Sequence, residues 1–153
     1  MMLSIESLVN VILSICDNVS NKKLQKIVYY VYAWYVTLNG EKIANIVFEA
    51  WEHGPVCRKI YNKYRCYGWN IIPPYKGFVL ADDEKIKFIQ SVINVYGGFS
   101  ADELEKMTHD ELPWKEARST GIMDAVISDV VMKAYYSRQL EIKEIIEHSF
   151  FLK

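Results

Sequence analysis

The pattern of apolar positions is clearest between residues 24 and 38, where apolar side chains recur every three or four residues. This spacing places them on one face of an α-helix. Ser20 is a suitable N-cap for this helix, and Asn39-Gly40 is a typical stop signal. The apolar positions are Leu24, Ile27, Val28, Val31, Tyr35 and Leu38. The pattern predicts the central helix of the fold.

Helical spacing also recurs on both sides of this central segment. The strongest start signal is Ser100, which can form a capping box with Glu103, while Phe99 and Leu104 occupy the positions of a hydrophobic staple. For a third helix, Pro55 is expected at the first helical position, where its missing N–H costs nothing. Further helices are expected at about 3–16, 54–68, 82–97, 100–109, 113–118, 128–135 and 141–153.

Residues 69–80 carry the only strand pattern. The apolar pairs Ile71-Ile72 and Phe78-Val79 flank the turn-forming run 73–77, which predicts a small β-ribbon near residues 70–80. The mixed pattern of residues 41–51 fits either a short helix or an extended stretch. The expected fold class is therefore mainly α: a compact single-domain helical bundle of about six to seven helices with a small β-ribbon.

Composition and charge narrow the possible partners. Aromatic residues make up 14% of the chain, including 11 tyrosines, so large rings can fill a core or serve an interface. The 18 basic and 19 acidic residues nearly balance, which argues against a nucleic-acid partner because phosphate binding needs an excess of Lys and Arg. The local cluster Lys22, Lys23 and Lys26 is expected to form a solvated helix face.

Cysteine usage and hydropathy indicate a compartment. The 3 cysteines are an odd number and cannot all pair within the chain. No apolar run reaches the roughly 18 residues of a membrane-spanning helix, and residues 1–16 lack the basic region of a signal peptide. The chain is therefore expected to be cytoplasmic and reduced, without a membrane partner.

The histidines and cysteines offer one imaginable metal site, made of His53, Cys57, Cys66 and His109. Structural zinc sites usually place their ligands in closely spaced pairs, and these four residues do not follow such a pattern. The preferred interpretation is two buried thiols and two histidines that form hydrogen bonds at turns. No metal and no other cofactor is expected.

Catalytic groups are equally weakly indicated. Cys57 and His109 could form a nucleophilic pair, but any chain with 3 cysteines and 3 histidines contains such combinations by chance. The carboxylate pairs Asp82-Asp83 and Asp110-Glu111 fall at expected helix starts, where negative charge complements the helix dipole. The chain is therefore not expected to be an enzyme.

Two clusters combine Trp, His and Pro residues within a short stretch of sequence. One runs from Phe48 to Val56, with Tyr61 following, and surrounds the Gly54-Pro55 pair. The other runs from Leu104 to Trp114 and contains His109. Trp and His at bends most often pack against their surroundings. Each cluster, taken alone, is therefore interpreted as part of the structural scaffold in preference to a functional site.

Both clusters belong to a longer series. In chain order it is Leu24-Gln25-Lys26, Tyr29-Tyr30, Trp34, Phe48-Glu49-Ala50-Trp51, His53-Gly54-Pro55-Val56, Tyr61, Tyr67-Gly68, Tyr96-Gly97, Phe99-Ser100-Ala101, Leu104, Thr108-His109 and Pro113-Trp114. This series resembles the Panacea domain, also described as the SocA-like or GepA-like phage-associated antitoxin family. The resemblance spans about residues 5–138 in order and register.

The resemblance implies a compact helical antitoxin domain at residues 1–140, which neutralises a cognate toxin of a toxin–antitoxin system by direct binding. One branch of the family instead delivers its toxin to an ATP-dependent protease, so a proteolysis adaptor is the first alternative. An enzyme with a site near His53 and His109 is the second. The family-signature positions, structural or partner-binding, are Trp51, His53, Gly54, Pro55, Tyr61, His109 and Trp114.

Residues 141–153 are expected to form a C-terminal amphipathic extension. Its apolar stripe consists of Ile142, Ile145, Ile146 and Phe150. The stripe suits a helix-in-groove contact with a partner, and it equally suits packing back onto the first helix. Both interpretations stay open.

Overall fold

The computed structural model describes the backbone of residues 1–151 and the side chains of residues 1–149. Its helices are α1 (Ile5–Ile15), α2 (Asn21–Asn39), α3 (Arg58–Tyr64), the 3-10 turn η1 (Arg65–Tyr67), α4 (Asp83–Tyr96), α5 (Ala101–His109), α6 (Leu112–Ser119), α7 (Asp129–Tyr136) and α8 (Leu140–Phe151). Two short strands, β1 (Glu49–Trp51) and β2 (Gly54–Val56), pair antiparallel. The mainly α fold class with one small β-ribbon is confirmed.

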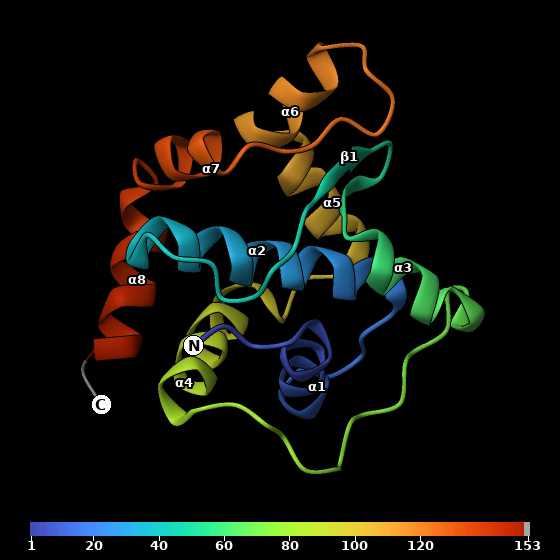
Figure 1. The fold of residues 1–153 in the computed structure, drawn as a ribbon, viewed down its shortest axis with the longest axis vertical. Coiled ribbons are helices and arrows are strands. Elements are labelled where there is room, and N and C mark those ends of the chain that lie inside the picture. Colours follow the sequence, from blue (N-terminus) through green and yellow to red (C-terminus); the bar gives the residue numbers. More distant parts are fainter. Residues whose placement is uncertain (152–153) are drawn as a thin grey trace.

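Helix α2 crosses the middle of the molecule, with the other helices arranged around it (Figure 1). It packs against α1, α3, α4, α5, α7 and β2. Every residue from Lys23 to Val36 is buried, on all faces of the helix. A helix surrounded in this way is a core element and not an amphipathic surface helix.

The predicted helix starts at serine and aspartate are confirmed. Ser20, Asp82, Ser100 and Ser128 each accept a hydrogen bond from a backbone N–H in the first turn. Ser100 and Glu103 form the complete capping box. These caps satisfy N–H groups that the helix itself leaves unpaired, which is why they locate helix starts from sequence.

The predicted position of the β-ribbon, near residues 70–80, is wrong. That segment is irregular and runs past the end of α1 (Figure 1). The backbone N–H of Ile72 donates to Val19 O and that of Tyr75 donates to Leu13 O, so the segment pairs with the α1 region instead of with itself. Pro73 and Pro74 also lack the N–H groups that a ladder needs.

The small sheet is formed instead by β1, at the end of the segment 41–51 whose pattern was mixed, and by β2, where a helix was expected to begin. A third short stretch joins it, because Ala50 N donates to Ala125 O and Ile127 N donates to Phe48 O. The helix predicted to start at Gly54-Pro55 is therefore wrong at its beginning. Gly54 has a φ of 110°, which no helix accommodates, and α3 starts at Arg58 after Cys57 as N-cap.

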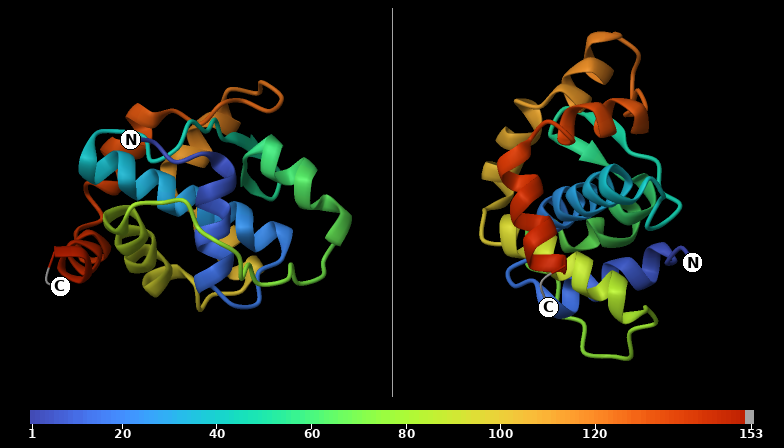
Figure 2. Two further views of the ribbon diagram at one scale, coloured as in Figure 1. Left: turned by 60° about the horizontal axis from the view of Figure 1, so that its bottom comes forward. Right: turned by 90° about the vertical axis from the view of Figure 1, so that its left-hand side faces the viewer.

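Helix α8 packs against α4 at one side of the molecule (Figure 2). Its packing neighbour is thus α4, whereas one of the two open interpretations named the first helix. Whether residues 141–153 act as an extension separate from a domain at residues 1–140 stays a prediction.

Candidate functional site

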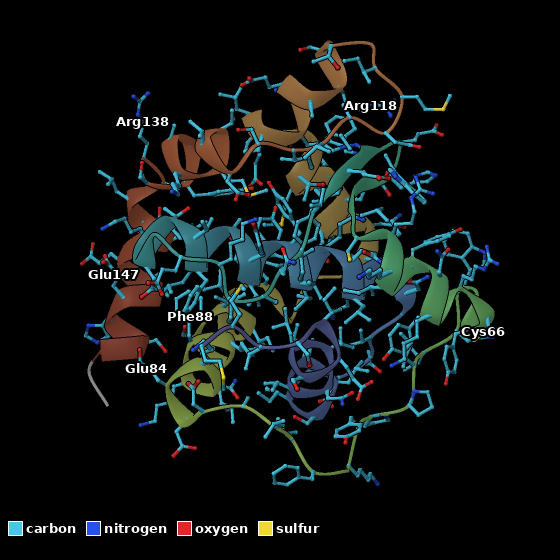
Figure 3. The ribbon with its side chains drawn as sticks, in the orientation of Figure 1. Cys66, Glu84, Phe88, Arg118, Arg138 and Glu147 are labelled. Atoms are coloured by element: carbon cyan, nitrogen blue, oxygen red, sulfur yellow. The ribbon has the colours of Figure 1, made fainter. Side chains whose placement is uncertain are left out.

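The family-signature residues, which are far apart in sequence, gather around the β1–β2 hairpin. The Trp51 ring packs edge-on against Tyr61, with ring centroids 5.0 Å apart. The Trp114 indole donates a hydrogen bond of 2.8 Å to Trp51 O, and the His109 ring stacks on Trp114 at 4.0 Å. Arg118 of α6 lies beside the hairpin and donates to Ala50 O (Figure 3). Helices α5 and α6 are thereby fixed to the hairpin.

Glu105 connects the two histidines of this region. Its Oε2 lies 3.2 Å from His53 Nδ1 and 4.0 Å from His109 Nε2, while its Oε1 forms an ion pair with Lys22. Partial burial acts to raise the pKa of Glu105, but the hydrogen bonds from Lys22 and His53 outweigh it and hold the pKa below its usual value. The predicted hydrogen bonding of histidines at turns is met at His53. His109 Nε2 is buried without a hydrogen-bond partner among the described residues.

Lys26 lies against β2 of the hairpin. Its side chain is 1% exposed, and its Nζ donates to Pro55 O at 3.2 Å. The neighbouring Gln25 accepts from Cys57 N at 2.9 Å. Polar side chains of α2 therefore satisfy the outer edge of β2, which has no further strand beside it.

The predicted solvated face at Lys22, Lys23 and Lys26 is wrong. Lys23 and Lys26 are buried, and Lys23 Nζ donates to Gly97 O at 2.7 Å. Lys22 is held by Asp102 and Glu105 of α5. The cluster lies where α2 is covered on all sides, so its charges meet backbone carbonyls and carboxylates instead of bulk water.

Burial has a large electrostatic effect on Lys26. Desolvation, together with the nearby charge of Lys22, lowers the pKa of Lys26 to about 7, and Glu105 opposes the shift only in part. A lysine buried in this way is an exception among globular proteins, where such groups are almost never fully buried unless paired.

A groove of about 470 Å³ opens beside Lys26, between α2, the hairpin and the end of α3. Gln25 and Lys26 line its floor, and the rings of Trp51, Tyr61 and Trp69 line its walls. Trp69 is 82% exposed, so its ring is held by little else. The groove thus combines a buried amine with apolar walls, a combination typical of ligand and partner sites.

The four residues considered for a metal site are not brought together as a set. Among residues 1–149, no group of three or more His, Cys, Asp and Glu side chains is placed to hold a metal ion. Cys57 is buried, and burial raises the pKa of its thiol, which makes it a poor nucleophile. Cys66, predicted to be buried, is exposed at the outer end of α3 and η1 (Figure 3).

The residues of the predicted partner-binding stripe on the tail differ in their exposure to solvent. Ile146 is fully buried and Ile142 is partly buried, whereas Ile145 is 49% exposed. The Phe150 side chain lies outside the described residues. A partner contact by this stripe stays a prediction, and Ile145 is its member open to solvent.

We expect Lys26→Met to raise the free energy of unfolding at pH 7 by about 1–2 kcal/mol. Methionine keeps the volume and removes a charge whose burial is costly, although Pro55 O loses its hydrogen bond. Because the pKa of Lys26 is about 7 in the folded state and 10.5 as the reference value, the unfolded chain binds more protons between these values. Wild-type stability should therefore rise across that range.

Urea unfolding of both proteins at pH 7 and pH 9.5 checks this expectation, because the advantage of the variant should shrink at the higher pH. Lys59→Met, at an exposed lysine of α3, serves as control. A variant less stable than wild type at both pH values would contradict it.

Comparison with known proteins bears on this region directly. The family model described as antitoxin SocA-like, Panacea domain, matches residues 24–115, which include the hairpin, most of the groove lining, His53 and His109. No curated protein and no solved structure matches the chain. No helix in the described part of the chain is long and apolar enough to cross a membrane. The predicted resemblance is confirmed, and the chain belongs to the SocA-like antitoxin family defined by the Panacea domain.

Proposed function

We propose that this protein is an antitoxin that neutralises a partner toxin by direct, stoichiometric protein–protein binding, without catalysis. The observation that carries the proposal is the family match over residues 24–115. An antitoxin-type domain implies a protein partner, and direct binding is the simplest way in which such a partner is held inactive.

Two features of the site support binding over catalysis. The signature residues His109 and Trp114 are engaged with one another, and His53 is engaged with Glu105, so that they support the hairpin. The groove beside them is lined mainly by aromatic and aliphatic surface, which suits a partner side chain.

The test is co-expression of the protein with the product of the adjacent gene in a host whose growth that product arrests. We expect growth to recover and the two proteins to co-purify in a fixed ratio. Recovery should require the antitoxin in at least equimolar amount, because each blocked toxin occupies one antitoxin. Recovery at a small fraction of the toxin concentration would indicate an enzyme and would overturn the proposal.

The choice of host distinguishes a blocking antitoxin from a proteolysis adaptor. A blocking antitoxin neutralises equally well in cells that lack their ATP-dependent proteases, whereas a proteolysis adaptor does not. If recovery disappears in the protease-deficient host and toxin levels rise there, the protein is an adaptor and direct blocking is wrong.

A further inference from the structure

Lys26 is a buried amine that no carboxylate among the described residues contacts directly, although the charge of Glu105 acts on it from a distance. None of the ion pairs among the described residues includes it, whereas the neighbouring Lys22 is paired with both Asp102 and Glu105. An ammonium group has three donors, and the hydrogen bond formed by Nζ is the one to Pro55 O. The remaining donors of Nζ therefore have no partner among the described residues, and Lys26 lines the groove.

The groove is also lined by more basic than acidic side chains. Among the described residues that line it, Lys22, Lys26 and Arg65 are basic, and Glu52 is the one carboxylate. Lys22 is neutralised from outside the groove by α5. Arg65, like Lys26, forms no ion pair among the described residues. The groove therefore offers an anion two basic side chains, Lys26 and Arg65, that form no ion pair among the described residues.

The walls determine which kind of anion fits. The rings of Trp51, Tyr61 and Trp69 and the side chain of Val56 form a mainly apolar lining. A doubly charged phosphate is costly to transfer into such surroundings, and the groove lacks the glycine-rich turn that usually binds one. A single carboxylate attached to apolar groups matches both the charge and the walls.

We propose that this groove binds a segment of the partner protein in which a Glu or Asp carboxylate pairs with Lys26, while flanking apolar side chains pack on Trp51, Tyr61 and Trp69. The proposal rests on the proposed function in one respect only, namely that the partner is the toxin. It specifies the chemistry of the contact, which an antitoxin role by itself leaves open.

The partner test uses the full-length protein and the adjacent gene product. Lys26→Met is expected to retain the fold and removes the charge, and Trp69→Ala removes a ring that contributes little to the core because it is 82% exposed. We expect each variant to bind the toxin at least tenfold more weakly than wild type. Lys59→Met, outside the groove on the exposed face of α3, should bind as wild type does. Unchanged binding by the Trp69 variant and by a folded Lys26 variant would overturn the proposal.

A direct probe of the groove is indole-3-propionate, a carboxylate joined to an aromatic ring, with the neutral indole-3-propionamide as matched control. Titration into ¹⁵N-labelled protein should shift the amide signals of Val56, Tyr61 and Gly68 with the acid only, and Lys26→Met should abolish the shifts. Equal shifts with acid and amide would show an apolar groove without a carboxylate site, and would overturn the role of Lys26.

The two proposals fail in different ways. If the wild-type protein rescues growth and both groove variants rescue equally well, the groove proposal is wrong and the antitoxin function stands. If the acid binds at Lys26 but the adjacent gene product is neither toxic nor bound, the carboxylate site stands and the proposed function is wrong.

Discussion

Replacing Gly54 by alanine should lower the free energy of unfolding by about 3 kcal/mol. Gly54 has a φ of 110°, a conformation that costs an L-residue about 1–2 kcal/mol. An added Cβ would also lie 2.6 Å from Lys26 Cε and 3.0 Å from Thr108 Oγ1. Lys26 cannot easily move away because it is buried, and overpacking of this kind costs about 1–3 kcal/mol.

The control for this substitution is Gly121→Ala. Gly121 has a φ of 73°, and nothing lies within 4 Å of its added Cβ, so this variant experiences the backbone strain without the steric overlap. We expect a loss of about 1 kcal/mol there. Urea unfolding at pH 7 measures both losses. Equal losses in the two variants would mean that the hairpin is not pressed against Lys26 and Thr108.

The contrast between Gly54 and the helix caps explains which parts of the fold could be predicted from sequence. Ser20, Asp82 and Ser100 cap helices through residues three positions away, so their roles depend on local sequence alone. The hairpin depends on distant partners: Gln25 and Lys26 satisfy the edge of β2, and Ala125 pairs with β1. Strands of three residues carry too little periodicity to predict such pairing.

The candidate site, like the fold, was predictable only in part. The resemblance identified the signature residues, and the structure brings them together around one hairpin. It did not identify Glu105 or Trp69, and the charge pattern assigned Lys26 to solvent. Periodicity treats charged positions as the outer face of a helix, and this rule fails for α2 because α2 is covered on all sides. The i,i+4 spacing of Glu105 and His109 was the one local signal of their contact.

A second large effect is expected at Glu111, whose predicted role at a helix start is only half right. Glu111 is the N-cap residue of α6, but its side chain makes no capping hydrogen bond. Its Oε1 instead accepts from the Tyr30 hydroxyl at 2.9 Å and the Tyr136 hydroxyl at 2.7 Å. Burial raises the pKa of Glu111 to about 7, and the two hydroxyls offset only part of that shift.

The sign of the resulting pH dependence follows from the two protonation equilibria. The folded-state pKa of about 7 exceeds the reference value of 4.5, so between these values the folded protein holds a proton that the unfolded chain has lost. The contribution of Glu111 to stability is therefore complete below about pH 4.5 and falls as pH rises towards 7. Between pH 5 and pH 8 the fall should reach about 2 kcal/mol, since one pKa unit corresponds to about 1.4 kcal/mol.

Glu111→Gln should remove this fall, because the glutamine stays neutral and still offers an oxygen to Tyr30 and Tyr136. Urea unfolding of wild type and variant at pH 5 and pH 8 gives a double difference, in which any pH-independent cost of the amide group cancels. We expect the variant to gain about 2 kcal/mol over wild type between the two pH values. Glu116→Gln, at an exposed glutamate of the same helix, should gain little. Parallel pH profiles for wild type and Glu111→Gln would mean that Glu111 ionises as freely in the folded protein as in the unfolded chain.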